Sequence, residues 1–145
     1  MDRLVELMKN LLADTFALYL KAQYYHWNVE GPNFKQYHDF FGDFYESVYA
    51  NVDSLAEQIR ALDSYAPGSL ERFVELKSIS GEDQVITAKE MLVRLKADNE
   101  KYLSLLDQTN TAAEAAGKKA LANYLQGVID SHSKHRWMLK SITKE

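Results

Sequence analysis

Cysteine is absent from this chain, and residues that favour turns are scarce: its 145 residues include only 2 prolines and 6 glycines. The absence of cysteine excludes disulfides, thiolate metal sites and cysteine nucleophiles. So few prolines and glycines leave little material for strands joined by tight turns, and long helices are expected. No apolar run is long enough to cross a bilayer, so the sequence predicts no membrane-spanning segment.

An excess of positive charge is also missing. The formal net charge is −4 and the isoelectric point about 5.6, which argues against a protein whose main task is to neutralise phosphates. A composition of 46% hydrophobic and 26% charged residues is typical of a folded globular protein, here one domain over residues 1–145. The N-terminus has no apolar segment of the secretory type, and a cytoplasmic location is expected.

Apolar residues recur at helical spacing along most of the chain. Asn33 and Gln36 are predicted to form a capping box at the start of one helix, and Thr87 and Glu90 at the start of another. Four of the predicted helices are long, each roughly 40 Å, and one is short. The predicted helices cover residues 4–29, 33–63, 70–77, 87–116 and 121–142.

The connection between the second and third long helices is the informative one. It covers residues 64–86, long enough to return along the whole bundle, whereas the other two connections are short. One long crossover at this place is the ferritin-like arrangement of a four-helix bundle. We therefore predict an all-α, ferritin-like four-helix bundle with a short extra helix in the crossover.

Ferritin-like bundles often hold two metals within one subunit through Glu-x-x-His motifs, and this chain has no such motif. The remaining candidate ligands are His26, His38, Asp53 and Glu57. The two carboxylates are four residues apart, about 40° around a helix, and can converge on one cation. Imidazole together with carboxylate suits iron, manganese or zinc.

Helix geometry decides where such a site could form. His38 and Asp53 lie on the same predicted helix about 22 Å apart, so they cannot bind one ion within a single chain. Antiparallel pairing of two chains about a two-fold axis would bring His38 of one chain opposite Asp53 and Glu57 of the other. Most of the aromatic residues lie between residues 16 and 49, more apolar surface than one core face needs, which also favours a dimer.

The identity and spacing of these residues resemble the Dps family of mini-ferritins, whose name refers to DNA protection in starved cells. The likeness extends over essentially the whole chain. It rests on His26-Trp27-Asn28-x-x-Gly31-x-Asn33-Phe34, on His38, on Asp53-x-x-Ala56-Glu57 and on Lys134-x-x-Trp137-Met138-Leu139.

The resemblance implies a hollow homo-oligomer, a dodecamer built from two-fold dimers. It implies a ferroxidase centre shared across the two-fold interface, with His26, His38, Asp53 and Glu57 as catalytic and metal-binding residues. Such a protein oxidises Fe(II) with hydrogen peroxide or dioxygen, stores the ferric iron inside and thereby detoxifies it. Iron is the only cofactor implied, with no organic group.

The chain departs from the family pattern beside the second histidine. The family usually has Asp where this sequence has Gly42, which puts the second iron position in doubt. Asp43 and Asp39 are the nearest substitutes, but they lie about 140° and 100° around the helix from His38. A non-catalytic or weakly metal-binding cage of the same fold is therefore the alternative prediction.

Three further features bear on function. Lys118 and Lys119 stand where the family often carries acidic residues lining an iron-entry pore, so weaker attraction of iron is expected there. With its acidic balance and no lysine-rich terminal arm in the sequence, the protein is expected to bind DNA weakly or not at all. His132 and His135 fall on the apolar stripe of the last helix and are predicted to be core or interface histidines whose hydrogen bonds are satisfied.

Overall fold

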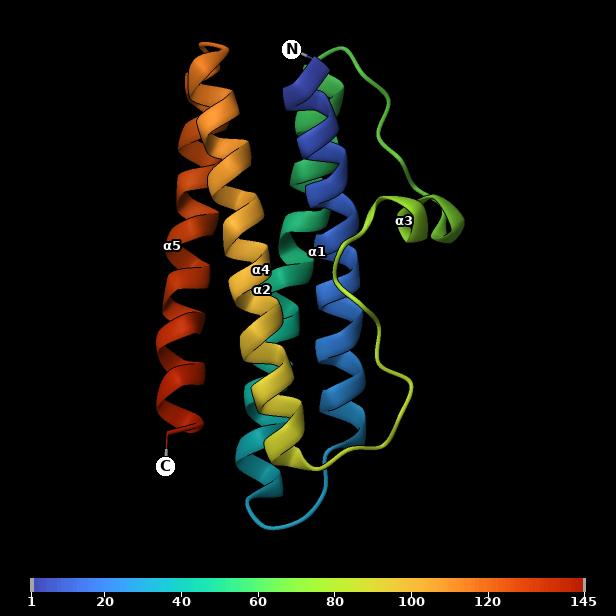
Figure 1. The fold of residues 1–145 in the computed structure, drawn as a ribbon, viewed down its shortest axis with the longest axis vertical. Coiled ribbons are helices and arrows are strands. Elements are labelled where there is room, and N and C mark those ends of the chain that lie inside the picture. The colour runs from blue at the N-terminus through green and yellow to red at the C-terminus, as the bar shows by residue number, and fades with distance from the viewer. Residues whose placement is uncertain (1, 145) are drawn as a thin grey trace.

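A computed structural model describes residues 2–144 and contains five helices, with no strand among these residues. Four long helices run side by side, and the short helix lies beside them in the connection between α2 and α4 (Figure 1). The predicted all-α, ferritin-like architecture and its short extra helix are confirmed. The helices are α1 (Asp2–Asn28), α2 (Phe34–Ala61), α3 (Leu70–Leu76), α4 (Ala88–Ala115) and α5 (Lys119–Ile142).

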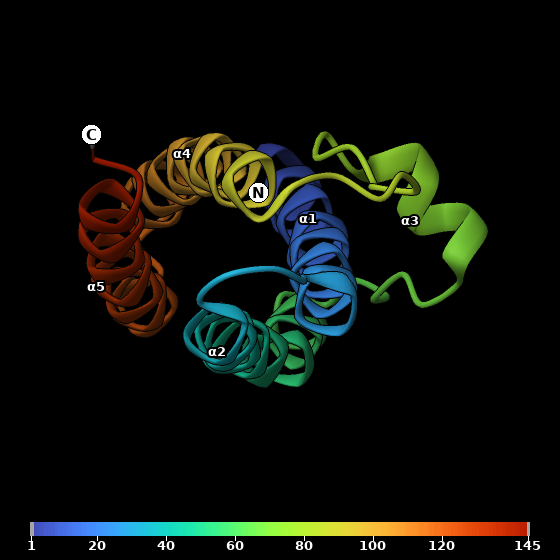
Figure 2. The same ribbon diagram turned by 90° about the horizontal axis from the view of Figure 1, so that it is seen from below.

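Two short turns and one long crossover connect the helices. The crossover leaves α2 at the end of the bundle where the chain starts, passes through α3 and reaches the opposite end, where α4 begins (Figure 1). Viewed along the bundle, α1 packs against both α2 and α4, and α5 packs against α4 (Figure 2). The backbones of α2 and α5 stay farther apart, so side chains alone fill the space between them.

Most predicted helix boundaries are confirmed to within a few residues, and the local chemistry explains them. Gly31 (φ 104°) follows the end of α1, and Gly117 (φ 71°) follows the end of α4, both in the left-handed conformation that favours glycine. Ser69 caps α3 by accepting a hydrogen bond from the backbone N–H of Arg72. Thr87 opens α4 with the predicted capping box.

The capping box predicted for Asn33 and Gln36 is wrong. Asn33 itself adopts a left-handed backbone (φ 65°, ψ 23°), and its side chain makes no capping hydrogen bond. An N-cap side chain bonds to the amides of the first helical turn when its own backbone is extended. The turn that follows Gly31 does not allow Asn33 an extended backbone. Backbone bonds take over: the Asn33 carbonyl accepts from the Tyr37 N–H, and the Phe34 N–H donates to the Gly31 carbonyl.

The core is a continuous apolar cluster drawn from all four long helices and from Ile79 of the crossover. Tyr25, Tyr102, Phe41 and Phe44 are its largest fully buried side chains. None of the helices within residues 2–144 is long and apolar enough to cross a membrane.

Buried polar side chains hold the crossover against α1. Asp14 of α1 is buried and accepts hydrogen bonds from the backbone N–H groups of Ser78 and Ile79, at 2.7 and 3.0 Å, and from the Ser78 hydroxyl at 2.7 Å. Lys21 lies about two turns further along α1. It forms a buried ion pair with Asp98 of α4 (2.7 Å) and donates to the Ser80 carbonyl of the crossover (3.0 Å). The crossover therefore has a fixed path despite its length.

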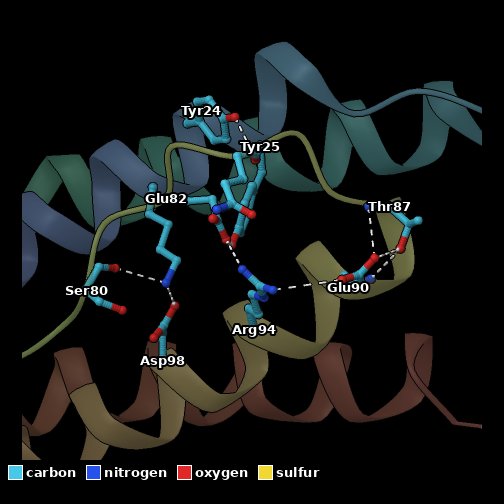
Figure 3. A network of polar contacts seen from close by, with 10 residues as sticks. Tyr24, Tyr25, Ser80, Glu82, Thr87, Glu90, Arg94 and Asp98 are labelled. Atoms are coloured by element: carbon cyan, nitrogen blue, oxygen red, sulfur yellow. Dashed lines mark hydrogen bonds and ion pairs between the residues drawn. The ribbon is translucent and has the colours of Figure 1, made fainter.

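A second set of anchors lies nearer the start of α4 (Figure 3). The Tyr25 hydroxyl and the Arg94 guanidinium both donate to the Glu82 carboxylate, at 3.0 and 2.7 Å, and the Tyr24 hydroxyl donates to the Gln84 carbonyl. Burial alone would raise the pKa of Glu82, but the hydrogen bonds from Arg94 and Tyr25 outweigh it and lower the pKa. Glu82 thus stays ionised and joins α1, the crossover and α4.

Candidate metal centre

The two predicted histidine ligands come together at the turn between α1 and α2. The rings of His26 and His38 stack with their centroids 3.8 Å apart and their planes at 15°. Nδ1 of His26 bonds to the His38 carbonyl at 2.6 Å, and Nδ1 of His38 bonds to the His26 carbonyl at 2.7 Å. A carbonyl can only accept, so each Nδ1 carries the proton.

This arrangement fits metal binding because it decides the state of the other ring nitrogen. In the neutral form of each ring, a proton on Nδ1 leaves Nε2 of His26 and of His38 with the lone pair, and within residues 2–144 neither Nε2 has a hydrogen-bond partner. Metal-ligating histidines commonly donate their other N–H to a carbonyl, which fixes the ring and the tautomer. The pair is preorganised as a two-imidazole donor.

Gly42 lies directly under the His26 ring. A Cβ at this position would meet Cε1 and Nδ1 of His26 at 3.0 Å, closer than ordinary contact, so a side chain here requires the ring to move. The substitutes considered for a carboxylate at position 42 lie elsewhere: Asp39 pairs with Lys35 at 3.0 Å, and Asp43 lines a cavity between α2 and α5. Within residues 2–144, no carboxylate joins the histidine pair in one cluster.

The two predicted carboxylate ligands form the other half of the donor set. Asp53 and Glu57 are exposed near the C-terminal end of α2, one turn apart. The hydrogen bond and the negative charge of Asp53 raise the pKa of Glu57, as expected where two carboxylates share a site without a cation. Since α2 is one uninterrupted helix, the predicted separation of about 22 Å from His38 holds. Within residues 2–144, no three histidine or acidic side chains converge on one point.

An exposed apolar face borders the carboxylates. A cavity of about 480 Å³ lies between α1, α3 and the crossover, and a second cavity of about 350 Å³ includes Asp53. Phe16 and Phe73 line both cavities. Four large apolar side chains around the first cavity are between 45% and 64% exposed, namely Leu20, Trp27, Leu70 and Val74.

Sequence reasoning missed the polar anchors of the crossover and misjudged the histidines of α5. Asp14, Lys21 and Asp98 were not among the predicted functional residues, and only their place on the buried stripe of each helix could have singled them out. His132 is buried as predicted, but its hydrogen bonds are only partly satisfied, since its Nε2 has no partner in the described part of the chain. The same is true of Nδ1 of His135.

Comparison with known proteins agrees with the fold. The model of the ferritin-like domain matches residues 5–145. The crystal structure of antigen TpF1 from Treponema pallidum superimposes with a TM-score of 0.96 at 30% identity, covering 99% of this chain and 93% of that one. Dps from Staphylococcus aureus gives a TM-score of 0.95 at 28% identity, covering 100% and 97%. The chain belongs to the Dps family of ferritin-like proteins.

A relative known from its sequence is also similar to this chain. An uncharacterized low temperature-induced protein from Nostoc is 32% identical over 139 residues, which cover 94% of this chain and 78% of that protein. The matched stretch thus covers most of this chain and about three quarters of that protein.

Proposed function

We propose that this Dps-family protein oxidises Fe(II) and stores the ferric product inside a hollow homo-oligomer. The centre combines His26 and His38 of one chain with Asp53 and Glu57 of a second chain. The observation that carries the proposal is the division of the donor set: two oriented Nε2 lone pairs and two unpaired carboxylates lie on one chain, about 22 Å apart. The histidine half offers imidazole donors but no carboxylate, and the carboxylate half offers oxygen donors but no imidazole.

The exposed apolar face supports the pairing of two chains. Leu20, Trp27, Leu70 and Val74 surround an apolar cavity next to Asp53, and a face of this kind on a soluble bundle favours burial against another chain. Two-fold pairing through this face makes α2 antiparallel to its copy and creates two identical centres per dimer. Six such dimers form the dodecamer that the family resemblance implies.

Iron is the substrate, and the chain supplies its coordination. Asp53 and Glu57 neutralise the positive charge and, as hard oxygen donors, favour the ferric product over the ferrous substrate. His26 and His38 bind as neutral imidazoles and leave coordination positions open for the oxidant. With hydrogen peroxide the balance is two Fe(II), one peroxide and two protons giving two Fe(III) and two waters.

A mixed assembly tests the sharing of ligands. One variant carries His26→Ala and the other carries Asp53→Ala with Glu57→Ala, so each is expected to be inactive alone. In a dimer with one chain of each kind, one centre loses all three side chains and the other keeps all of them. We expect co-refolded mixtures to regain Fe(II) oxidation, up to about half of the centres in the mixed dimers.

A failure to regain oxidation, with mixed dimers demonstrated by mass spectrometry, would show that the ligands do not come from two chains. A conservative change gives a second measurement. Glu57→Gln keeps the shape of the side chain but removes its charge, and Fe(II) affinity and oxidation rate should both fall sharply.

A cage that binds iron weakly and does not oxidise it is the second candidate, and Gly42 favours it. The position that usually supplies an aspartate in the family supplies no ligand here, and Lys118 and Lys119 bring positive charge to the expected pore. Anaerobic titration of the metal-free protein with Fe(II) separates the two: one tightly held iron per chain supports the proposed centre, and none supports the passive cage.

A further inference from the structure

Two histidines of α5 point into the bundle three residues apart. His132 is fully buried, and its ring centroid lies 5.0 Å from that of His135. Nδ1 of His132 bonds to Oδ1 of Asn99 at 2.7 Å, while Nδ2 of Asn99 donates to the His132 carbonyl at 3.0 Å. Because Nδ2 of Asn99 donates to a carbonyl, the orientation of the Asn99 amide is fixed. Its Oδ1 must then accept the bond from His132, so Nδ1 of His132 carries the proton. Nε2 of His132 is therefore a bare lone pair.

The inward-facing nitrogens of the two rings have no partner within residues 2–144. Nε2 of His132 and Nδ1 of His135 are both buried and without a hydrogen bond. The Tyr102 hydroxyl, whose ring packs against His132, is already bonded to Thr15 at 2.6 Å. Buried polar atoms in native proteins are nearly always paired, so two neighbouring orphans indicate an occupant that the chain itself does not provide.

Both imidazoles are neutral in the folded protein. Burial lowers the pKa of His132 to about 3, and burial together with the charge of Lys134 lowers the pKa of His135 to about 4. A positively charged imidazolium could not bind a cation, whereas a neutral ring offers a lone pair at physiological pH.

A cavity reaches His135, the outer member of this pair, from the surface. A cavity of about 230 Å³ lies between α2 and α5, where the backbones stand apart, and His135 lines it. The exposed carboxylate of Asp43 and the hydroxyl of Ser47 line the same cavity from α2, with the Ser47 Oγ 3.4 Å from Nε2 of His135. Lys134 lies on its α5 side. The cavity therefore opens His135 to solvent and carries one carboxylate and one ammonium group in its wall.

We propose that His132 and His135 form a second cation site, within one chain, for a divalent transition metal of borderline hardness such as Zn²⁺. Nε2 of His132 and Nδ1 of His135 are the protein ligands, and water from the cavity completes the coordination. Asp43 supplies negative charge at the entrance, and Asn99 fixes the His132 ring as outer-shell partners of metal ligands do. Imidazole donors suit zinc, copper, iron and nickel, and bundle metal sites use inward residues at the same i, i+3 spacing.

Cobalt titration tests this site separately from the iron centre. The assembled His26→Ala, Asp53→Ala, Glu57→Ala protein, which lacks both halves of the iron centre, is stripped of metal with a chelator and titrated with Co²⁺, and visible absorption and equilibrium dialysis report binding. We expect one Co²⁺ per chain, displaced by Zn²⁺. Adding His135→Gln or His132→Gln should weaken binding at least about tenfold. The matched control is Lys134→Gln, which lies on the same cavity and should leave binding unchanged or tighter.

The proposal fails if this triple variant binds no Co²⁺ at millimolar concentration, or if adding His135→Gln leaves binding as tight as in the triple variant. Circular dichroism and particle size check that each variant is folded and assembled. A readout that needs no variant is anomalous diffraction at the cobalt edge from soaked wild-type crystals. A peak between the two imidazoles supports the site, and a peak only at Asp53 and Glu57 overturns it while supporting the iron centre.

Discussion

Two contact regions of the fold, here called seams, differ in whether their buried polar groups are hydrogen-bonded. The first seam lies between α1 and the crossover, and the second lies between α2 and α5. In the first, Asp14 accepts three hydrogen bonds and Lys21 is paired with both Asp98 and the Ser80 carbonyl. In the second, His132 and His135 each keep a buried ring nitrogen without a hydrogen-bond partner among residues 2–144. The polar groups that join α1 to the crossover are paired within the chain, whereas the unpaired ring nitrogens of α5 are available to bind a ligand from outside the chain.

The histidine pair at the turn between α1 and α2 combines the two patterns. Nδ1 of His26 and of His38 is paired with backbone, as in a structural contact, whereas Nε2 of each is left without a partner in the described residues. Comparing paired with unpaired nitrogens therefore separates the part of a side chain that builds the fold from the part available to a metal. Four stability measurements test this contrast.

The largest effect is expected at the buried ion pair. Lys21→Met leaves the carboxylate of Asp98 without its counter-charge in a site where burial already raises its pKa. Removing one partner of a buried pair costs about 3 to 5 kcal/mol, whereas replacing both by apolar residues costs much less. Urea unfolding should show that Lys21→Met combined with Asp98→Leu is more stable than Lys21→Met alone. Equal or lower stability of the double variant would argue that the pair is not coupled.

A somewhat smaller loss is expected at the crossover anchor. Asp14→Ala leaves the buried N–H groups of Ser78 and Ile79 without an acceptor, which should cost about 2 to 3 kcal/mol. Asp14→Asn keeps one acceptor oxygen and should cost less. Hydrogen exchange should show the loss of protection concentrated at residues 78–79. A uniform loss over all helices would contradict a local anchor.

An acid-dependent effect is expected at Glu82. Its pKa is lowered in the folded state, so its stabilisation is fully present above the ordinary glutamate value and is lost as pH falls through the folded value. Glu82→Gln should cost about 1 to 2 kcal/mol at pH 7. The difference from wild type in the free energy of unfolding should then shrink below about pH 4.5. A difference that stays constant down to pH 3.5 would exclude this linkage.

The smallest effect is expected at the α2–α5 seam. The only polar interaction that His135→Leu removes is a 3.4 Å contact to Ser47, and leucine can still pack against the Phe44 ring that His135 contacts. In metal-free protein the stability of this variant should therefore stay within about 1 kcal/mol of wild type or rise. Thermal unfolding in the presence of a chelator measures this. A loss as large as that of Asp14→Ala would show that the ring has a structural partner.

Helical periodicity, glycine positions and the long crossover were enough to predict the architecture, because each depends on local sequence. The capping box at Thr87 was predictable for the same reason. That at Asn33 was not, because the turn after Gly31 imposes a left-handed backbone that residue preferences alone do not reveal.

Tertiary contacts decided what the sequence could not indicate. The path of the crossover depends on Asp14, Lys21 and Glu82 meeting partners 12 to 77 residues away along the chain, and spacing on one helix says nothing about such partners. The candidate ligands His26 and His38 were visible as residues, but their reciprocal bonds to each other's carbonyl required the structure. The orphaned nitrogens of α5 likewise emerge only once every neighbour is known.

The reciprocal bonding of His26 and His38 has a consequence for how mutations at this centre combine. Each ring is held in one rotamer by stacking on the other ring and by a bond to the other residue's backbone, so the two lose their rotational freedom together. Deleting either ring frees the survivor to rotate away from the metal. His26→Ala and His38→Ala should therefore be strongly non-additive, the double variant being scarcely worse than either single one. In this respect the two side chains behave as a single bidentate ligand.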